Sequence, residues 1–232
     1  MYPVLNTPGV QADRTTSQRR VFKQSTYEMI AGGGIINGAT SRDPGNTSDV
    51  DKLRAGVLMG LRSSDDQWSP SILGVTTNAE AIGATTIEVS AAVATELARR
   101  VGTTGTFRLT GPAVAGGVVA SEVVTYSAVN TTTGDITVTA IVNAYVAGSL
   151  VQPTDGSQTP LSLIPDGFPA KVTDQDGTSI DIEWPCIPIG GVIDSSEIIN
   201  WPSDASLKEW IMNRLNGSHG GRFIFDHVLI GE

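Results

Sequence analysis

The stretch EVVTYSAVNTTTGDITVTAI, residues 122–141, carries the clearest structural pattern in this chain. β-Branched and aromatic residues fill residues 122–127 and 136–141, and this composition is typical of β-strands. Between them lies NTTTGD, residues 130–135, in which a glycine and an aspartate mark a tight turn. The stretch therefore predicts a β-hairpin and favours a mainly β fold.

The hairpin belongs to a wider block, residues 76–155, that is rich in Thr, Val and Ala and poor in aromatic residues. Within this block, Val93, Leu97 and Val101 recur at helical spacing and predict a short helix. Gly102 is its expected C-terminal stop. Because the block has its own strand, helix and hairpin signals, we expect an inserted β-rich subdomain that is dispensable for binding a partner.

The composition excludes several classes of protein. The chain has 232 residues and a net charge of -9, whereas a nucleic-acid-binding surface needs an excess of positive charge. No apolar run reaches the roughly 18 residues of a membrane-spanning helix, and the N-terminus lacks the apolar core of a signal peptide. Cys186 is the single cysteine, which leaves no partner for a disulfide or a zinc cluster. We expect neither a nucleic-acid nor a membrane partner.

Residues 1–45 differ from the rest because they hold prolines, a polar run, three consecutive glycines and a locally basic cluster. We interpret them as an extended N-terminal arm that is poorly ordered over residues 1–40 in the free protein and orders on a partner surface. A disordered tail is the alternative. The side chains expected to contact the partner are Arg14, Arg19, Arg20, Phe22, Lys23 and Tyr27.

The C-terminal part is richer in tryptophan. Trp184 ends an alternating, strand-like stretch, and Ser206 with Glu209 forms a capping box before apolar residues at helical spacing. Residues 222–229 are apolar on both faces and predict a buried final strand. The side chains expected at an oligomer or shell interface are Trp184, Trp201 and Trp210.

No motif for catalysis, a cofactor or a metal ion is visible. Residues 174–177 (DQDG) are interpreted as a hairpin turn and not as a calcium loop, which would need further ligands. His219 and His227 are expected at the surface and in the core, since neither accompanies a nucleophile motif. Asp181 and Glu183 fit a solvated strand face, although distant carboxylates that pair for glycoside cleavage stay open. We expect a protein that is not an enzyme, with no cofactor.

Residues 53–60 (LRAGVLMG), a polar turn and residues 68–70 (WSP) together resemble the head decoration, or capsid cement, proteins of tailed bacteriophages. Gly56, Gly60 and Leu58 match the glycines and the apolar position of that pattern. The resemblance to lambda-like decoration proteins covers about a third of the chain. It implies a small β-tulip or barrel-like decoration domain, with a short C-terminal helix, formed by residues 46–75 and 156–232. Residues 76–155 are then an insertion.

The same resemblance implies a virion protein that is made in the host cytoplasm and binds the outer surface of the assembled capsid. It would stabilise the shell by bridging neighbouring subunits of the major capsid protein. The implied oligomer is a trimer at three-fold positions, with a dimer as the alternative. Other functions also stay open: a head fibre, tail or baseplate component, or a glycan-binding module that uses the inserted block.

Overall fold

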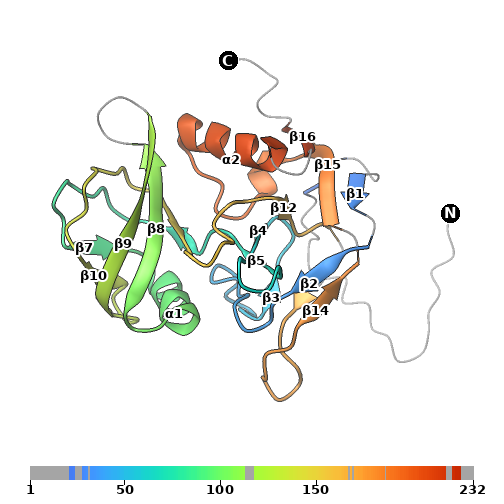
Figure 1. Cartoon of the computed structure of the whole chain (residues 1–232), viewed down its shortest axis with the longest axis horizontal. Helices are drawn as coiled ribbons and strands as arrows, with labels where there is room; N and C mark the ends of the chain where they lie inside the picture. Colours follow the sequence, from blue (N-terminus) through green and yellow to red (C-terminus); the bar gives the residue numbers. More distant parts are fainter. Residues whose placement is uncertain are drawn as a thin grey trace, which may run out of the picture.

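The computed structural model describes residues 21–23, 28–30, 32–112, 118–166, 168, 170–185, 187–217 and 221–225. Over these residues the chain is mainly β, as predicted, with four sheets and two α-helices. The described residues also include one short 3-10 helix, η1 (Ser195–Glu197). The largest sheet lies on one side of the molecule, and the three smaller sheets lie together on the other (Figure 1).

The largest sheet has six strands and curls into a small barrel. Its strands, in order across the sheet, are β6 (Gly74–Val75), β11 (Leu150–Gln152), β8 (Gly105–Pro112), β9 (Val119–Val129), β10 (Asp135–Val138) and β7 (Thr86–Glu88). A bridge between Thr76 and Val89, which directly follow β6 and β7, joins the two edges of the sheet. We call this closed sheet with its helix the barrel, and the rest of the described chain the base.

The predicted hairpin is confirmed as strands β9 and β10 of the barrel wall. β9 and β10 pair antiparallel, with Ile136 opposite Val129. Across the turn, the Asn130 N–H donates to the Asp135 carbonyl at 2.8 Å. The alternating pattern of this stretch therefore does place one face of each strand in a buried core, as period-2 alternation requires.

The predicted helix of the barrel is also confirmed, as α1 (Ala91–Arg100). It begins after Ser90, whose hydroxyl accepts a hydrogen bond from the Val93 N–H. Val93 and Leu97 are buried in the barrel core. Val101, the third member of the expected apolar stripe, lies just past the helix end and is partly exposed.

The base contains a five-stranded sheet. Its strands, in order, are β12 (Ser162–Leu163), β4 (Leu58–Leu61), β5 (Trp68–Pro70), β2 (Gly34–Ile36) and β14 (Ile182–Trp184). β4 and β5 pair antiparallel around the predicted polar turn. A Cβ atom at Gly60 would lie 2.1 Å from the Ser157 carbonyl oxygen, and one at Gly56, whose φ is +89°, would lie 2.3 Å from that of Glu197. Both glycines of the motif are therefore required by close backbone approach.

Two smaller sheets and the second helix complete the base. They comprise β1 (Glu28–Ile30), β15 (Ile187–Ile193) and β16 (Arg222–Phe225), the pair β3 (Lys52–Leu53) and β13 (Ala170–Lys171), and α2 (Ala205–Gly217). β16 runs parallel to β15. The inner face of α2 buries Leu207, Ile211 and Leu215 against Phe223 and Phe225 of β16, so α2 covers one face of the three-stranded sheet.

The N-terminal arm differs from its predicted length of residues 1–45. β2 lies inside the five-stranded sheet between β5 and β14, and β1 pairs with β15. Val21 and Phe22 are buried in the core of the base. The expected poor order over residues 1–40 therefore does not hold where these strands pair with others. Residues 1–20 lie outside the described residues, so the arm stays a prediction there.

Two C-terminal predictions also need correction. Asp204 caps α2 in place of Ser206, because the Leu207 N–H donates to the Asp204 carboxylate at 3.0 Å. The final strand is buried on one face only, since α2 covers Phe223 and Phe225, whereas Ile224 is 48% exposed on the other face.

Arg100 at the end of α1 fixes the barrel to the base. Its side chain is 1% exposed, and its guanidinium lies 2.8 Å from the Asp155 carboxylate. It also donates to the Ser157 hydroxyl at 2.7 Å and to the Pro70 carbonyl at 2.9 Å. Because these partners belong to chain segments outside the barrel, the helix end and the base hold one fixed relative orientation.

The block predicted at residues 76–155 corresponds to the barrel except at its edges. Leu150 in β11 is buried in the core of the base, together with Leu58 and Ile72. Asp155 holds Arg100 across the junction. Excising the whole block would remove both contributions to the base. That the barrel is dispensable for binding a partner therefore stays a prediction, and deleting only the residues between Thr76 and Ser149 tests it better.

Candidate functional site

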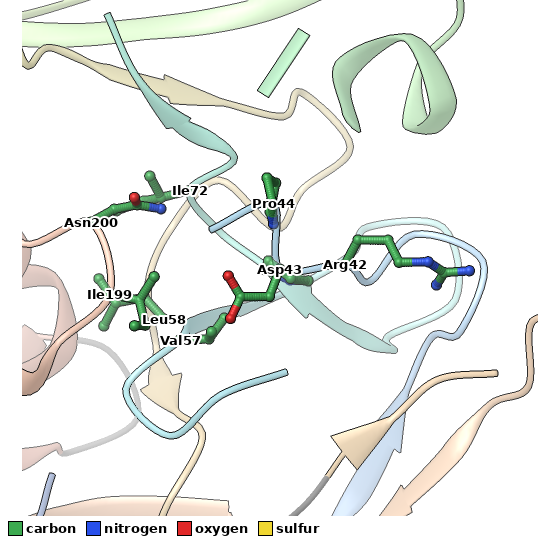
Figure 2. Close-up of a pocket in the computed structure, with 9 residues that line it drawn as sticks. Arg42, Asp43, Pro44, Val57, Leu58, Ile72, Ile199 and Asn200 are labelled. Carbon is green, nitrogen blue, oxygen red and sulfur yellow. The ribbon is translucent and has the colours of Figure 1, made fainter. Parts of the chain in front are cut away.

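A small pocket lies in the base beside β4 and β5 (Figure 2). Its walls are Arg42, Asp43, Pro44, Val57, Leu58, Pro70, Ile72, Ile199 and Asn200. It offers space for about one water molecule. The Arg54 guanidinium holds both oxygens of the Asp43 carboxylate, at 2.6 and 2.9 Å. The Asp43 carboxylate in the wall of this pocket is therefore neutralised by Arg54.

Within the described part of the chain, no three His, Cys, Asp or Glu side chains gather so as to hold a metal ion. Neither helix in that part has the length and hydropathy to cross a membrane. Residues 174–177 form the expected hairpin turn, in which the Asp174 N–H donates to the Thr178 carbonyl at 2.9 Å. Cys186, His219 and His227 lie outside the described residues.

A well-built anchor holds the chain where it enters the base. The backbone N–H groups of Val21 and Phe22 both donate to the Asp166 carboxylate, at 2.7 and 3.1 Å. The Lys23 ammonium lies 3.4 Å from Asp194. A hydrogen bond from the Ser196 hydroxyl, and more weakly the Lys23 charge, lower the pKa of Asp194 against the opposing effect of burial. We call residues 21–23 and these two carboxylates the N-terminal anchor.

Replacing Asp166 with alanine is expected to release the N-terminal anchor. Two backbone donors would lose a charged acceptor, which is worth about 1.5–3 kcal/mol per well-formed bond. Amide hydrogen exchange should show faster exchange at Val21 and Phe22 with little change in the barrel. Asp176→Ala, at an exposed turn, is the matched control. Unchanged protection at Val21 and Phe22 would mean that Asp166 does not hold this segment.

The predicted arm contacts separate into two groups. Phe22 is 3% exposed and packs in the core of the base, so its assignment as a partner contact is wrong. Lys23 is exposed and forms part of the anchor. The others lie outside the described residues, namely Arg14, Arg19, Arg20 and Tyr27. Of these, Arg14, Arg19 and Arg20 precede the anchor in the sequence.

The three C-terminal tryptophans also differ in their positions. Trp184 is fully buried, with its ring edge-on to Trp68 at 5.3 Å, so it cannot serve an interface and that assignment is corrected. Trp201 stacks on Phe225 at 5.6 Å and is partly buried. Trp210 is partly buried on α2, and the Arg214 guanidinium lies over its ring at 5.4 Å. Trp201 and Trp210 keep accessible surface that a partner can cover.

Sequence reasoning missed the outer face of the three-stranded sheet. α2 covers the inner face, whereas Met29 of β1 is 47% exposed and Ile224 of β16 is 48% exposed. Across Gly190 of β15, Arg222 reaches toward Glu28 at 3.7 Å. We call this surface the open face. The irregular strand β1 and the parallel pairing of β16 gave no signal in the sequence from which to find it.

The basic side chains of the described chain differ in their pairing and in their exposure to solvent. Most of its basic side chains form internal ion pairs: Lys23 with Asp194, Arg42 with Asp51, Arg54 with Asp43, Arg62 with Asp65, Arg99 with Glu96, Arg100 with Asp155, Lys171 with Asp49 and Arg222 with Glu28. Arg214 on α2 is exposed, and so is Arg222 on β16 although it lies near Glu28. The exposed cations of the base thus include two beside the sheet that carries the N-terminal anchor.

Comparison with known proteins adds no relative to this description. A scan against protein-family models finds no matching model, and searches of curated proteins and of solved structures find no match.

Proposed function

We propose that this chain is a phage head decoration, or cement, protein that binds the exterior of the assembled capsid. The observation that carries the proposal is the N-terminal anchor. It joins residues 1–20, which hold three arginines against one aspartate and which we call the basic segment, to an otherwise acidic body. The motif around Gly56 and Gly60 supports it, because the close backbone contacts there account for both glycines. A body of this kind suits docking and not catalysis.

The mechanism follows from having two separated points of attachment on one rigid body. The basic segment reaches one major capsid protein subunit while the base rests on its neighbour. Shell expansion or rupture then has to break both contacts at once. A protein that binds only the assembled shell stabilises it by mass action. Copies that contact one another as a trimer, or as a dimer, would add avidity because each contact raises the effective concentration of the next.

Undecorated heads of the cognate phage provide the test. Purified protein should co-sediment with these heads at many copies per particle and raise the temperature at which they rupture. Binding should weaken as salt is added, because screening reduces the attraction between the basic segment and an acidic shell. Binding at only a few copies per particle would favour a head fibre, tail or baseplate component. An absence of binding would contradict the proposal.

A further inference from the structure

The outer edge of strand β16 is covered by a side chain from the end of α2. In the described part of the chain, β16 pairs with β15 alone and forms one edge of the three-stranded sheet. The Asn216 side-chain Nδ2 group donates to the Phe223 carbonyl at 3.1 Å, and the Asn216 Oδ1 atom accepts from the Phe223 N–H at 2.8 Å. One amide therefore satisfies both backbone groups of Phe223, as a neighbouring strand would.

The packing at the end of α2 holds Asn216 in this position. The preceding residue, Leu215, is fully buried in the core of the base together with Phe223, so the last turn of the helix has a fixed rotation. A Cβ atom at Gly221 would lie 1.9 Å from the Leu215 carbonyl oxygen. Glycine therefore lets the chain return close to the helix end, which brings the edge of β16 beside the Asn216 amide.

Without this cover, β16 would have the features of a strand that pairs with another chain. An edge strand with free N–H and C=O groups and apolar side chains is a template for a further strand. β16 has the sequence RFIF over residues 222–225, and Ile224 is 48% exposed. Two copies of this chain present the same edge, so antiparallel pairing about a two-fold axis would satisfy the backbone groups of both copies at once.

We propose that Asn216 blocks the outer edge of β16 and so prevents a second copy of this chain from adding to the three-stranded sheet there. The amide occupies the donor and the acceptor of Phe223 that an incoming strand would need. An aliphatic side chain at residue 216 would leave both of them unpaired. This role does not depend on the proposed function, and association through β16 is separate from the trimer or dimer expected on a capsid.

Replacing Asn216 with alanine in the full-length protein tests the proposal, because it removes both hydrogen bonds and opens the edge. Since a second copy can then form these bonds, we expect the protein concentration at half-maximal dimer formation through β16 to fall at least about tenfold. Analytical ultracentrifugation over a range of concentrations measures this. Asn213→Ala, at another exposed position of α2, is the matched control and should associate like the wild type. Circular dichroism checks that both variants are folded.

A second substitution shows whether the new association uses β16. Lysine protects exposed strand edges, and the exposed side chain of Ile224 can be replaced without opening the core. Adding Ile224→Lys to Asn216→Ala should therefore restore the association state of the wild type. If the double variant still associates, the interface lies elsewhere and the proposal is overturned. The proposal is also wrong if Asn216→Ala alone associates no more than the wild type.

Amide hydrogen exchange tests the contact in the unmodified protein as well. The Phe223 amide of the wild type should be protected at all protein concentrations, although it lies on an outer edge. In Asn216→Ala it should exchange faster in dilute solution and regain protection as the concentration rises, because the second copy then supplies the acceptor. Rapid exchange of Phe223 in the wild type would mean that Asn216 does not cover the edge, and this result contradicts the proposal.

Discussion

Replacing Arg100 with methionine is expected to lower the free energy of unfolding by about 3–5 kcal/mol, the usual cost of removing one partner from a buried ion pair. The loss arises because Asp155 would keep its charge near Ser157 with only the more distant Arg62, at 3.8 Å, to offset it. Urea unfolding at neutral pH measures the effect. Arg214→Met, on the exposed side of α2, should change stability by less than about 0.5 kcal/mol.

The Arg100–Asp155 ion pair also predicts how the stability lost in Arg100→Met depends on pH. Burial alone raises the pKa of Asp155, but Arg100 and Ser157 outweigh it and lower the pKa below its ordinary value of 3.8. A carboxyl whose pKa is lower in the folded protein stabilises the fold above its unfolded pKa, and this stabilisation is lost as the pH falls through the folded pKa. The difference between wild type and Arg100→Met should therefore shrink in acid below about pH 4. A constant difference down to pH 2 would contradict the role of Asp155.

Replacing Trp184 with alanine is expected to cost about 3–5 kcal/mol in the isolated protein, as for other large aromatic residues in cores. Its ring is fully buried and lies between Trp68 and Phe168, with ring centroids at 5.3 and 6.3 Å. Thermal unfolding of the purified chain measures the loss. Trp184→Phe should recover most of the stability because it keeps the aromatic contacts.

Trp210→Ala is the comparison for this prediction, because Trp210 is only partly buried on α2. It should reduce stability by less than half as much as Trp184→Ala. Stability unchanged by Trp184→Ala, with weaker binding to heads, would restore the idea that Trp184 contacts a partner.

The local elements of the barrel could be read from the sequence, because they depend on neighbouring residues. The turn that begins at Asn130, and the apolar spacing of Val93 and Leu97 in α1, can each be recognised from a few neighbouring residues. Asp204 was missed because Ser206 offers a similar capping signal two residues later, and only the local backbone shows which side chain reaches the Leu207 N–H.

The position of the N-terminal chain could not be predicted in the same way. Gly34–Ile36 becomes part of a sheet through residues far along the chain, with Ile36 paired to Ile182 on one side and to Trp68 on the other. Its glycines and polar neighbours have low intrinsic strand preference, which tertiary pairing overrides. For the same reason the burial of Phe22 and the open face depended on the three-dimensional structure.

The junction between barrel and base has a consequence for protein engineering. The chain enters the barrel through β6 and leaves it through β11, and these strands are direct antiparallel neighbours, with Val75 opposite Leu150. Paired residues on such strands lie about 5 Å apart, so the two connections occupy one narrow site on the base. Any foreign domain whose own termini are close together meets the same geometric requirement. The junction is thus a natural graft site, at which enzymes or antigens could be displayed in place of the barrel.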